Sequence, residues 1–258
     1  MRLLISVADA AEASDALAGG ADIIDAKDSL AGALGAVSVE VLREIHAAVA
    51  GARPLTAALG DASLEAATER AAAAFAEAGA AVVKVGFSGI RSTARAAALV
   101  AAAVRGAKTG SGDRAGGVVA VAYADADRVA SLAPADLINV AARAGADGLL
   151  IDTADKRGPG LLRLVAPDAL AALVAQAHEA GLFVVLAGKL TADDLPFARD
   201  AGADIVGVRG AACDDGRTGR VAARKVRLLR SLCAASAALD DLAAQRQAQR
   251  LTLIGGNN

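Results

Sequence analysis

The chain has 258 residues, a length that suits one large domain, and its 27 basic and 29 acidic side chains give a net charge of −2, which predicts no nucleic-acid partner. Alanine supplies most of the 55% hydrophobic content, and because no run of about 18 strongly apolar residues is free of charge and glycine, we expect no membrane partner. The two cysteines, Cys213 and Cys233, show neither metal-ligand spacing nor a disulfide pattern.

Four segments repeat one pattern, in which an Ala-rich helix ends in glycine and runs into a short apolar strand. They are AGGADIIDAK (18–27), EAGAAVVKVG (77–86), RAGADGLLID (143–152) and DAGADIVGVR (200–209). Glycine tolerates the left-handed turn that satisfies the last carbonyls of a helix. The repeats therefore predict a chain built from successive βα units.

In chain order, short apolar runs predict eight strands at 3–7, 22–27, 55–59, 82–86, 117–123, 148–152, 183–188 and 204–208. Helical periodicity lies between them at 8–12, 38–50, 63–79, 91–107, 134–145, 168–180 and 191–202. This alternation predicts the α/β class and a single (β/α)8 TIM barrel with a parallel eight-stranded core over residues 1–233. Residues 234–258 are expected to form a helical or flexible appendage.

The connections carry local signals. The first connection is expected to be short, and the Gly-rich segment 109–117 is expected to be a surface loop on the N-terminal side of the strands. Asp61 and Ser63 precede one predicted helix, while Thr191 and Asp194 predict a capping box at another. The first strand begins without a leader peptide, so we expect a cytoplasmic location.

Two lysines, Lys27 and Lys84, lie in predicted strands among apolar neighbours. In a closed parallel barrel the C-terminal strand ends open into the active site. Burial and a second nearby ammonium lower the pKa of a lysine, which frees an amine to form a Schiff base with a carbonyl substrate. The alternative is structural, an ion pair of Lys27 with Asp25 or of Lys84 with a neighbouring carboxylate.

Further charged residues fall at the same predicted edge. Asp25 and Lys27 are two positions apart, so they share one face of a strand and both can point into the barrel mouth. Asp152 ends another strand and Lys156 follows it in the loop IDTADK. We expect both near the mouth; the alternatives are a turn cap for Asp152 and a solvated charge for Lys156.

Two glycine-containing loops follow the last two predicted strands, LAGKL (186–190) and GVRGAAC (207–213). In barrels these loops often present backbone N–H groups to a phosphate, and an arginine adds charge-assisted bonds. The predicted phosphate-binding residues are Gly188, Gly207, Arg209 and Gly210. In VAYADADR, which follows the fifth strand, Tyr123, Asp125 and Arg128 either border the pocket or cap a loop.

The segments IIDAKD, VVKVGFSG, VAYADADR, IDTADK, LAG and VGVRGAAC resemble the family of (5-formylfuran-3-yl)methyl phosphate synthases, over residues 1 to about 233. The resemblance implies a lyase that condenses two molecules of glyceraldehyde 3-phosphate to 4-(hydroxymethyl)-2-furancarboxaldehyde phosphate, a precursor of methanofuran-type one-carbon carriers. It implies that Lys27 is the Schiff-base lysine, that Lys84 accepts a proton, and that Asp25, Asp152 and Lys156 assist. Lys189 departs from the small polar residue of the family.

The residues by themselves predict an aldolase-like lyase for a small phosphorylated substrate, with no metal or organic cofactor because an iminium acts as the electron sink. One rival is a class I aldolase for another phosphorylated aldehyde. The other is a non-catalytic barrel that binds a phosphorylated metabolite. The sequence leaves the oligomeric state open, and a homo-oligomer is compatible with it.

Overall fold

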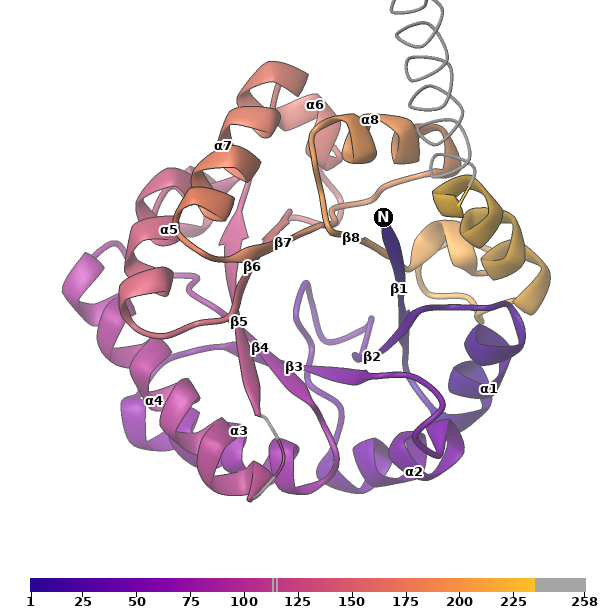
Figure 1. The fold of residues 1–258 in the computed structure, drawn as a ribbon, viewed down its shortest axis with the longest axis horizontal. Helices are drawn as coiled ribbons and strands as arrows, with labels where there is room; N and C mark the ends of the chain where they lie inside the picture. Colours follow the sequence, from indigo (N-terminus) through magenta and orange to yellow (C-terminus); the bar gives the residue numbers. More distant parts are fainter. Residues whose placement is uncertain (113, 115, 235–258) are drawn as a thin grey trace, which may run out of the picture.

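A computed structural model describes residues 1–112, 114 and 116–234 as a closed barrel of parallel strands surrounded by helices (Figure 1). The strand order around the barrel follows the chain, from β1 to β8, which confirms the predicted TIM barrel. The strands are β1 (Arg2–Val7), β2 (Ile23–Ala26), β3 (Leu55–Asp61), β4 (Val82–Gly86), β5 (Gly117–Tyr123), β6 (Gly148–Asp152), β7 (Phe183–Leu186) and β8 (Ile205–Val208).

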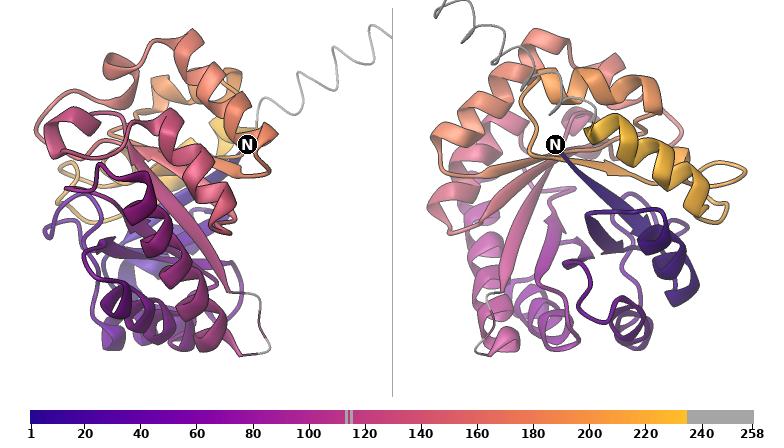
Figure 2. Two further views of the ribbon diagram at one scale, coloured as in Figure 1. Left: turned by 90° about the vertical axis from the view of Figure 1, so that its left-hand side faces the viewer. Right: turned by 45° about the vertical axis from the view of Figure 1, so that its right-hand side comes forward.

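Helices connect successive strands on the outside of the barrel (Figures 1 and 2). They are α1 (Ala10–Ala18), α2 (Val39–Val49), α3 (Glu65–Glu77), α4 (Thr93–Ser111), α5 (Pro134–Arg143), α6 (Leu161–Leu164), α7 (Pro167–Glu179) and α8 (Leu195–Asp200). The 3-10 turns are η1 (Ala126–Val129), η2 (Ala192–Asp194) and η3 (Gly210–Ala212). No helix in the described part of the chain combines the length and apolar content needed to cross a membrane.

Two expectations about the connections were wrong. The first connection holds a helix from Ala10 to Ala18, longer than the predicted stretch at 8–12, because the Asp9 side chain accepts a hydrogen bond from Glu12 N and the following Ala-rich run favours helix. The predicted loop at 109–117 begins later, since α4 continues to Ser111, whose hydroxyl donates to the carbonyl of Ala107. Residues 113 and 115 lie outside the described part.

Helix starts follow the local signals in part. Thr191 and Asp194 form the predicted capping box at η2. At α3 the N-cap is Leu64, which makes no side-chain capping bond, so Asp61 and Ser63 do not cap this helix. Asp61 instead accepts hydrogen bonds from Tyr123 and from the backbone of Ser88.

The apolar core has two separate parts. The larger lies between the strands and the helices, and includes Ile5, Ile24, Leu99 and Ile138. The smaller fills the inside of the barrel with side chains from several strands: Leu4, Ile23, Ala58, Val119, Val121, Tyr123, Leu150, Val185 and Ile205. Apolar packing inside the barrel closes it below the C-terminal strand ends, so a cavity can form only above this layer.

A last helix, at residues 223–234, closes the ring between α8 and α1 (Figure 1). Its side chains Val226 and Leu229 are buried. A Cβ atom at Gly19 would lie 2.4 Å from Val226 Cβ, so the absence of a side chain at this position lets the first and last helices pack closely. The expected appendage at 234–258 lies, apart from residue 234, outside the described residues, and the boundary at 233 stays a prediction.

Candidate active site

A cavity of about 400 Å³ lies at the C-terminal ends of the strands. The nine residues predicted for catalysis and phosphate binding all line it: Asp25, Lys27, Lys84, Asp152, Lys156, Gly188, Gly207, Arg209 and Gly210. They come from five strands or the loops that follow them, β2, β4, β6, β7 and β8. The closed barrel thus brings together residues more than 180 positions apart in the sequence.

Asp25 is fully buried on β2 and holds Lys84 of β4. Lys84 Nζ lies 2.5 Å from Asp25 Oδ1, and the side chains of Ser6 and Thr56 donate hydrogen bonds of 2.9 and 2.7 Å to the same carboxylate. Each oxygen of Asp25 therefore has a partner, as a buried carboxylate requires. Of the two ion pairs that the structural alternative offered, the structure forms the one of Lys84 with a neighbouring carboxylate, which is Asp25, and not the one of Lys27 with Asp25.

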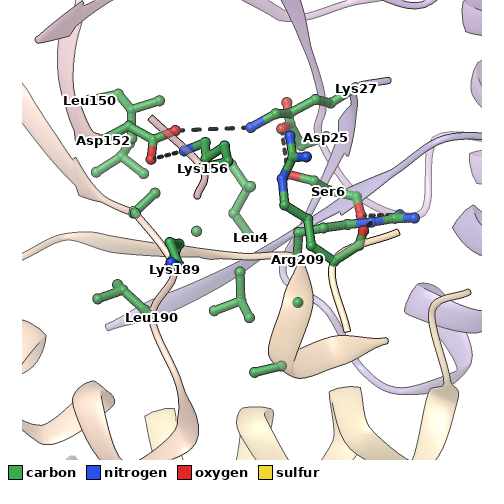
Figure 3. A pocket seen from close by; sticks show the side chains of 18 of the residues that line it. Leu4, Ser6, Asp25, Lys27, Leu150, Asp152, Lys156, Lys189, Leu190 and Arg209 are labelled. Atoms are coloured by element: carbon green, nitrogen blue, oxygen red, sulfur yellow. Dashed lines mark hydrogen bonds and ion pairs between the residues drawn. The ribbon is translucent and has the colours of Figure 1, made fainter. Parts of the chain in front are cut away.

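Asp152, at the end of β6, faces two lysines (Figure 3). Lys156 Nζ lies 2.6 Å from Asp152 Oδ1, and Lys27 Nζ lies 3.9 Å from Asp152 Oδ2. Asp152 also accepts a 2.7 Å hydrogen bond from Thr153 N. Lys27 is thus the less tightly paired of the two lysines, although its side chain is only 11% exposed.

This arrangement determines the charge states. Burial, together with the charges of Lys156 and Lys84, lowers the pKa of Lys27 from 10.5 to about 8 against the opposing effect of Asp152. Burial acts to raise the pKa of Asp152, but the charges of Lys156 and Lys27 outweigh it and hold that pKa below its usual range. At pH 7 a pKa of about 8 leaves roughly one-tenth of Lys27 as uncharged amine, far more than an ordinary lysine has, beside the Asp152 carboxylate.

The loop after β7 has an unusual backbone. Gly188 has φ of 108° and Lys189 has φ of 59°, a conformation that costs energy for a residue with a side chain. Within the described residues, the backbone N–H groups of Gly188 and Lys189 make no hydrogen bond. Successive unpaired N–H groups in a loop form a concavity that suits an anion.

Arg209 lines the cavity but is already engaged. Its guanidinium forms an ion pair with Glu12 of α1, and both side chains are buried. Gly207 faces the inside of the barrel, where an added Cβ would lie 3.3 Å from Ala187 Cβ. The absence of a side chain at Gly207 therefore leaves space at the bottom of the cavity. The ion pair of Arg209 connects the end of β8 to α1.

Tyr123, Asp125 and Arg128 do not line the cavity. Asp125 accepts hydrogen bonds of 2.7 and 2.8 Å from the backbone N–H groups of Ala154 and Asp155, and Arg128 contacts the Asp155 side chain. These contacts agree with loop capping, the second of the two readings that the sequence allowed. Burial and the neighbouring Asp61 carboxylate raise the pKa of the Tyr123 hydroxyl above its ordinary value.

Sequence reasoning missed Ser6, Thr56 and Arg217, which all take part in the site. Ser6 and Thr56 are single hydroxyl residues inside apolar strands, RLLISV and LTAALGD, and this interruption is a signal that could have identified them. Arg217 lies in an irregular Gly-rich segment whose path no periodicity predicts.

A family model described as 4-HFC-P synthase matches residues 3–230 of the chain. A protein from Methanopyrus kandleri named (5-formylfuran-3-yl)methyl phosphate synthase is 41% identical over 237 residues, which cover 92% of this chain and 99% of the relative. A protein of the same name from Methanocaldococcus jannaschii is 38% identical over 236 residues, covering 90% of this chain and all of the relative (100%).

Solved structures resemble this one at lower identity. Phosphoribosyl anthranilate isomerase from Thermus thermophilus superposes with a TM-score of 0.61 at 16% identity, covering 91% of this chain and 99% of that one. A 3-hexulose-6-phosphate synthase gives a TM-score of 0.60 at 20% identity, with 90% and 99% coverage. At such identities the likeness supports the barrel fold alone.

Proposed function

The chain belongs to the 4-HFC-P synthase family and is an enzyme of that family, and from this premise we propose that it condenses two molecules of glyceraldehyde 3-phosphate through a Schiff base on Lys27. The product is 4-(hydroxymethyl)-2-furancarboxaldehyde phosphate, used to build a methanofuran-type one-carbon carrier. The reaction balances: two three-carbon units give the six carbons of the product, and one inorganic phosphate and two waters leave.

The observation that carries the proposal is the buried amine of Lys27, whose pKa is about 8. An uncharged amine is needed to attack an aldehyde, and a lysine at its ordinary pKa supplies very little of it near neutral pH. The carbinolamine first formed loses water to give an iminium. The ionised Asp152 carboxylate, 3.9 Å from Lys27 Nζ, stabilises this cation.

The iminium acidifies the adjacent C–H bond, and loss of that proton gives an enamine. Two groups can accept the proton: the Asp152 carboxylate, or Lys84 as the uncharged amine once its ammonium proton has moved to Asp25, 2.5 Å away. The enamine carbon then attacks the aldehyde of the second triose phosphate, forming the new C–C bond. Cyclisation, loss of phosphate and dehydration give the furan, and water releases the product from Lys27.

Two phosphorylated substrates must be held at once. We assign one phosphate to the loops after β7 and β8, through Gly188, Gly207, Arg209 and Gly210, which line the cavity beside the lysines. The unpaired N–H groups of Gly188 and Lys189 support an anion at this edge. We assign the remaining phosphate to Lys156, which follows the neighbouring strand β6 and also lines the cavity.

The test is incubation with glyceraldehyde 3-phosphate alone, followed by ultraviolet detection of a furan aldehyde and by borohydride reduction. We expect the furan to accumulate and a triose-derived mass on the peptide that contains Lys27. A class I aldolase for another aldehyde would give the adduct without a furan. A barrel that only binds a metabolite would give neither, and that result would overturn the proposal.

A further inference from the structure

The segment after β8 brings two arginines to the cavity, Arg209 and Arg217. They differ in how many of their hydrogen-bond donors are free. A guanidinium has five N–H donors. The sequence drew attention only to Arg209, which directly follows the strand, but the contacts of the two side chains favour a different division of roles.

Arg209 has no donor to spare. Its Nε donates to the carbonyl of Arg217, Nη1 to Ser6 O and Glu12, and Nη2 to Glu12 and Gly219 O. These five bonds use the whole guanidinium. An anion could bind Arg209 only by displacing one of these acceptors, and displacing Glu12 would leave a buried carboxylate without its guanidinium partner.

Arg217 is half-buried and open to the cavity. Its single side-chain hydrogen bond among the described residues runs from Nη2 to the carbonyl of Gly32, at 2.5 Å, so most of its fork has no protein partner. A Cβ atom at Gly210 would lie 3.8 Å from Arg217 Cβ, which places this arginine beside the loop assigned to phosphate. Its charge also lies close enough to Asp152 for the two to interact.

Arg209 fixes the backbone from which Arg217 projects. It donates to the carbonyl of Arg217 itself and to that of Gly219, two residues further along. Its ion pair with Glu12 anchors this segment to α1. The buried arginine therefore holds the loop in place, and the half-buried arginine presents its fork to the cavity.

We propose that Arg217 is the guanidinium that binds a phosphate of the substrate, and that Arg209 is a positioning residue for the segment that carries it. A planar fork with free donors matches a phosphate monoester, which it can hold through two parallel charge-assisted bonds. The inference rests on the proposed function only in requiring a phosphorylated substrate, and revises which arginine contacts it.

The probe is glycerol 3-phosphate, which has the phosphate monoester but no carbonyl and so cannot form a Schiff base. Calorimetry should show binding to the unmodified protein and at least tenfold weaker binding to Arg217→Ala, with Arg217→Lys in between because lysine keeps the charge but loses the fork. The matched control is Arg220→Ala, which removes an equal charge from the same segment at an exposed arginine that pairs with Asp9. Thermal unfolding should show that all three variants fold.

A second readout separates binding from amine chemistry. Borohydride trapping on Lys27 with unphosphorylated glyceraldehyde should be the same in Arg217→Ala and the unmodified protein. The inference is overturned if Arg217→Ala binds glycerol 3-phosphate as tightly as Arg220→Ala does, or if the unmodified protein does not bind it. If Arg217→Ala loses affinity but no furan forms from glyceraldehyde 3-phosphate, the inference stands and the proposed function fails.

Discussion

Lys27 and Lys156 face the two oxygens of a single carboxylate, that of Asp152, at 3.9 and 2.6 Å. Lys156, from the loop after β6, makes the shorter contact. Lys27, which follows β2, therefore has the longer and weaker contact with the same carboxylate. Because a like charge nearby also disfavours its ammonium form, Lys156 helps to lower the pKa of Lys27, as the proposed amine nucleophile requires.

Replacing Lys156 by Met should therefore raise the pKa of Lys27. The rate of borohydride-trapped adduct formation, measured against pH, should rise through a midpoint near 8 in the unmodified protein, and this midpoint should move to higher pH in Lys156→Met. Lys189→Met is the control, since Lys189 contacts Gly158 O rather than Asp152. A midpoint that stays fixed or moves to lower pH in Lys156→Met would contradict the argument.

Lys27→Arg should abolish the covalent adduct while preserving the positive charge near Asp152. Arginine stays protonated and cannot act as the amine nucleophile. Mass spectrometry after borohydride reduction with glyceraldehyde 3-phosphate should find no triose-derived mass on any peptide. Labelling of Lys84 or Lys156 in this variant, together with turnover, would move the nucleophile to that residue.

Burying Lys27 also makes stability depend on pH. Its pKa is about 8 in the folded protein and 10.5 when unperturbed, so between these values the unfolded chain binds more protons and the free energy of unfolding rises with pH. From pH 7 to pH 9 the contribution is about 1.4 kcal/mol, at 1.36 kcal/mol per unit. Urea unfolding should show this rise to be missing in Lys27→Met; an equal rise in both proteins would rule out Lys27 as its source.

Lys84→Ala and Asp152→Ala should each lower turnover by about 10²–10⁴-fold, the range for loss of a positioned acid or base. Lys84→Ala leaves a buried Asp25 that still accepts from Ser6 and Thr56 but has lost its cationic partner, so this variant should be less stable, and thermal unfolding should show that it is folded at the assay temperature. Lys108→Ala, at an exposed lysine in the last turn of α4, provides the control. Steady-state assays that find full turnover in both site variants would assign these side chains a structural role.

Gly210→Val tests the phosphate loop without challenging the fold. A Cβ at this position would be 3.6–3.8 Å from atoms of Arg217, an ordinary contact, and Gly210 is not among the residues with positive φ. The valine methyl groups would nevertheless occupy the approach to the backbone. We expect a raised KM for glyceraldehyde 3-phosphate and unchanged trapping of unphosphorylated glyceraldehyde; an unaltered KM would remove Gly210 from the subsite.

The barrel and its charged mouth could be predicted because both depend on short-range pattern. Gly-terminated helices followed by apolar strands predict the βα units, and the position of Lys27 or Asp152 at a strand end predicts the edge on which it lies. Which lysine forms an ion pair with which aspartate could not be predicted in this way. Whether Asp25 holds Lys27 or Lys84 depends on the relative position of β2 and β4, which are separated by β3 and related by no local rule.

The role of Arg209 was equally hidden. Nothing near VGVRG in the sequence indicates that its partner is Glu12, almost 200 positions earlier (|i−j| of 197). The contact forms because β8 pairs with β1, with Arg2 opposite Ile205, and so brings the last strand to the first helix. The pairing of the last strand with the first therefore determines which charged side chains already have a protein partner and which remain available to a ligand.

That same closure sets an order of events during synthesis. The sheet has an open edge at β1 until β8 pairs with it, and the Arg209 guanidinium finds its acceptors only when Glu12, Ser6 and Gly219 are all present. A nascent chain that stops before Ile205 lacks β8, so it has no closed ring and leaves the edge of β1 unpaired, which is a site for wrong pairing between chains. The barrel is completed by its last strand, and until β8 leaves the ribosome the edge of β1 has no partner on that side.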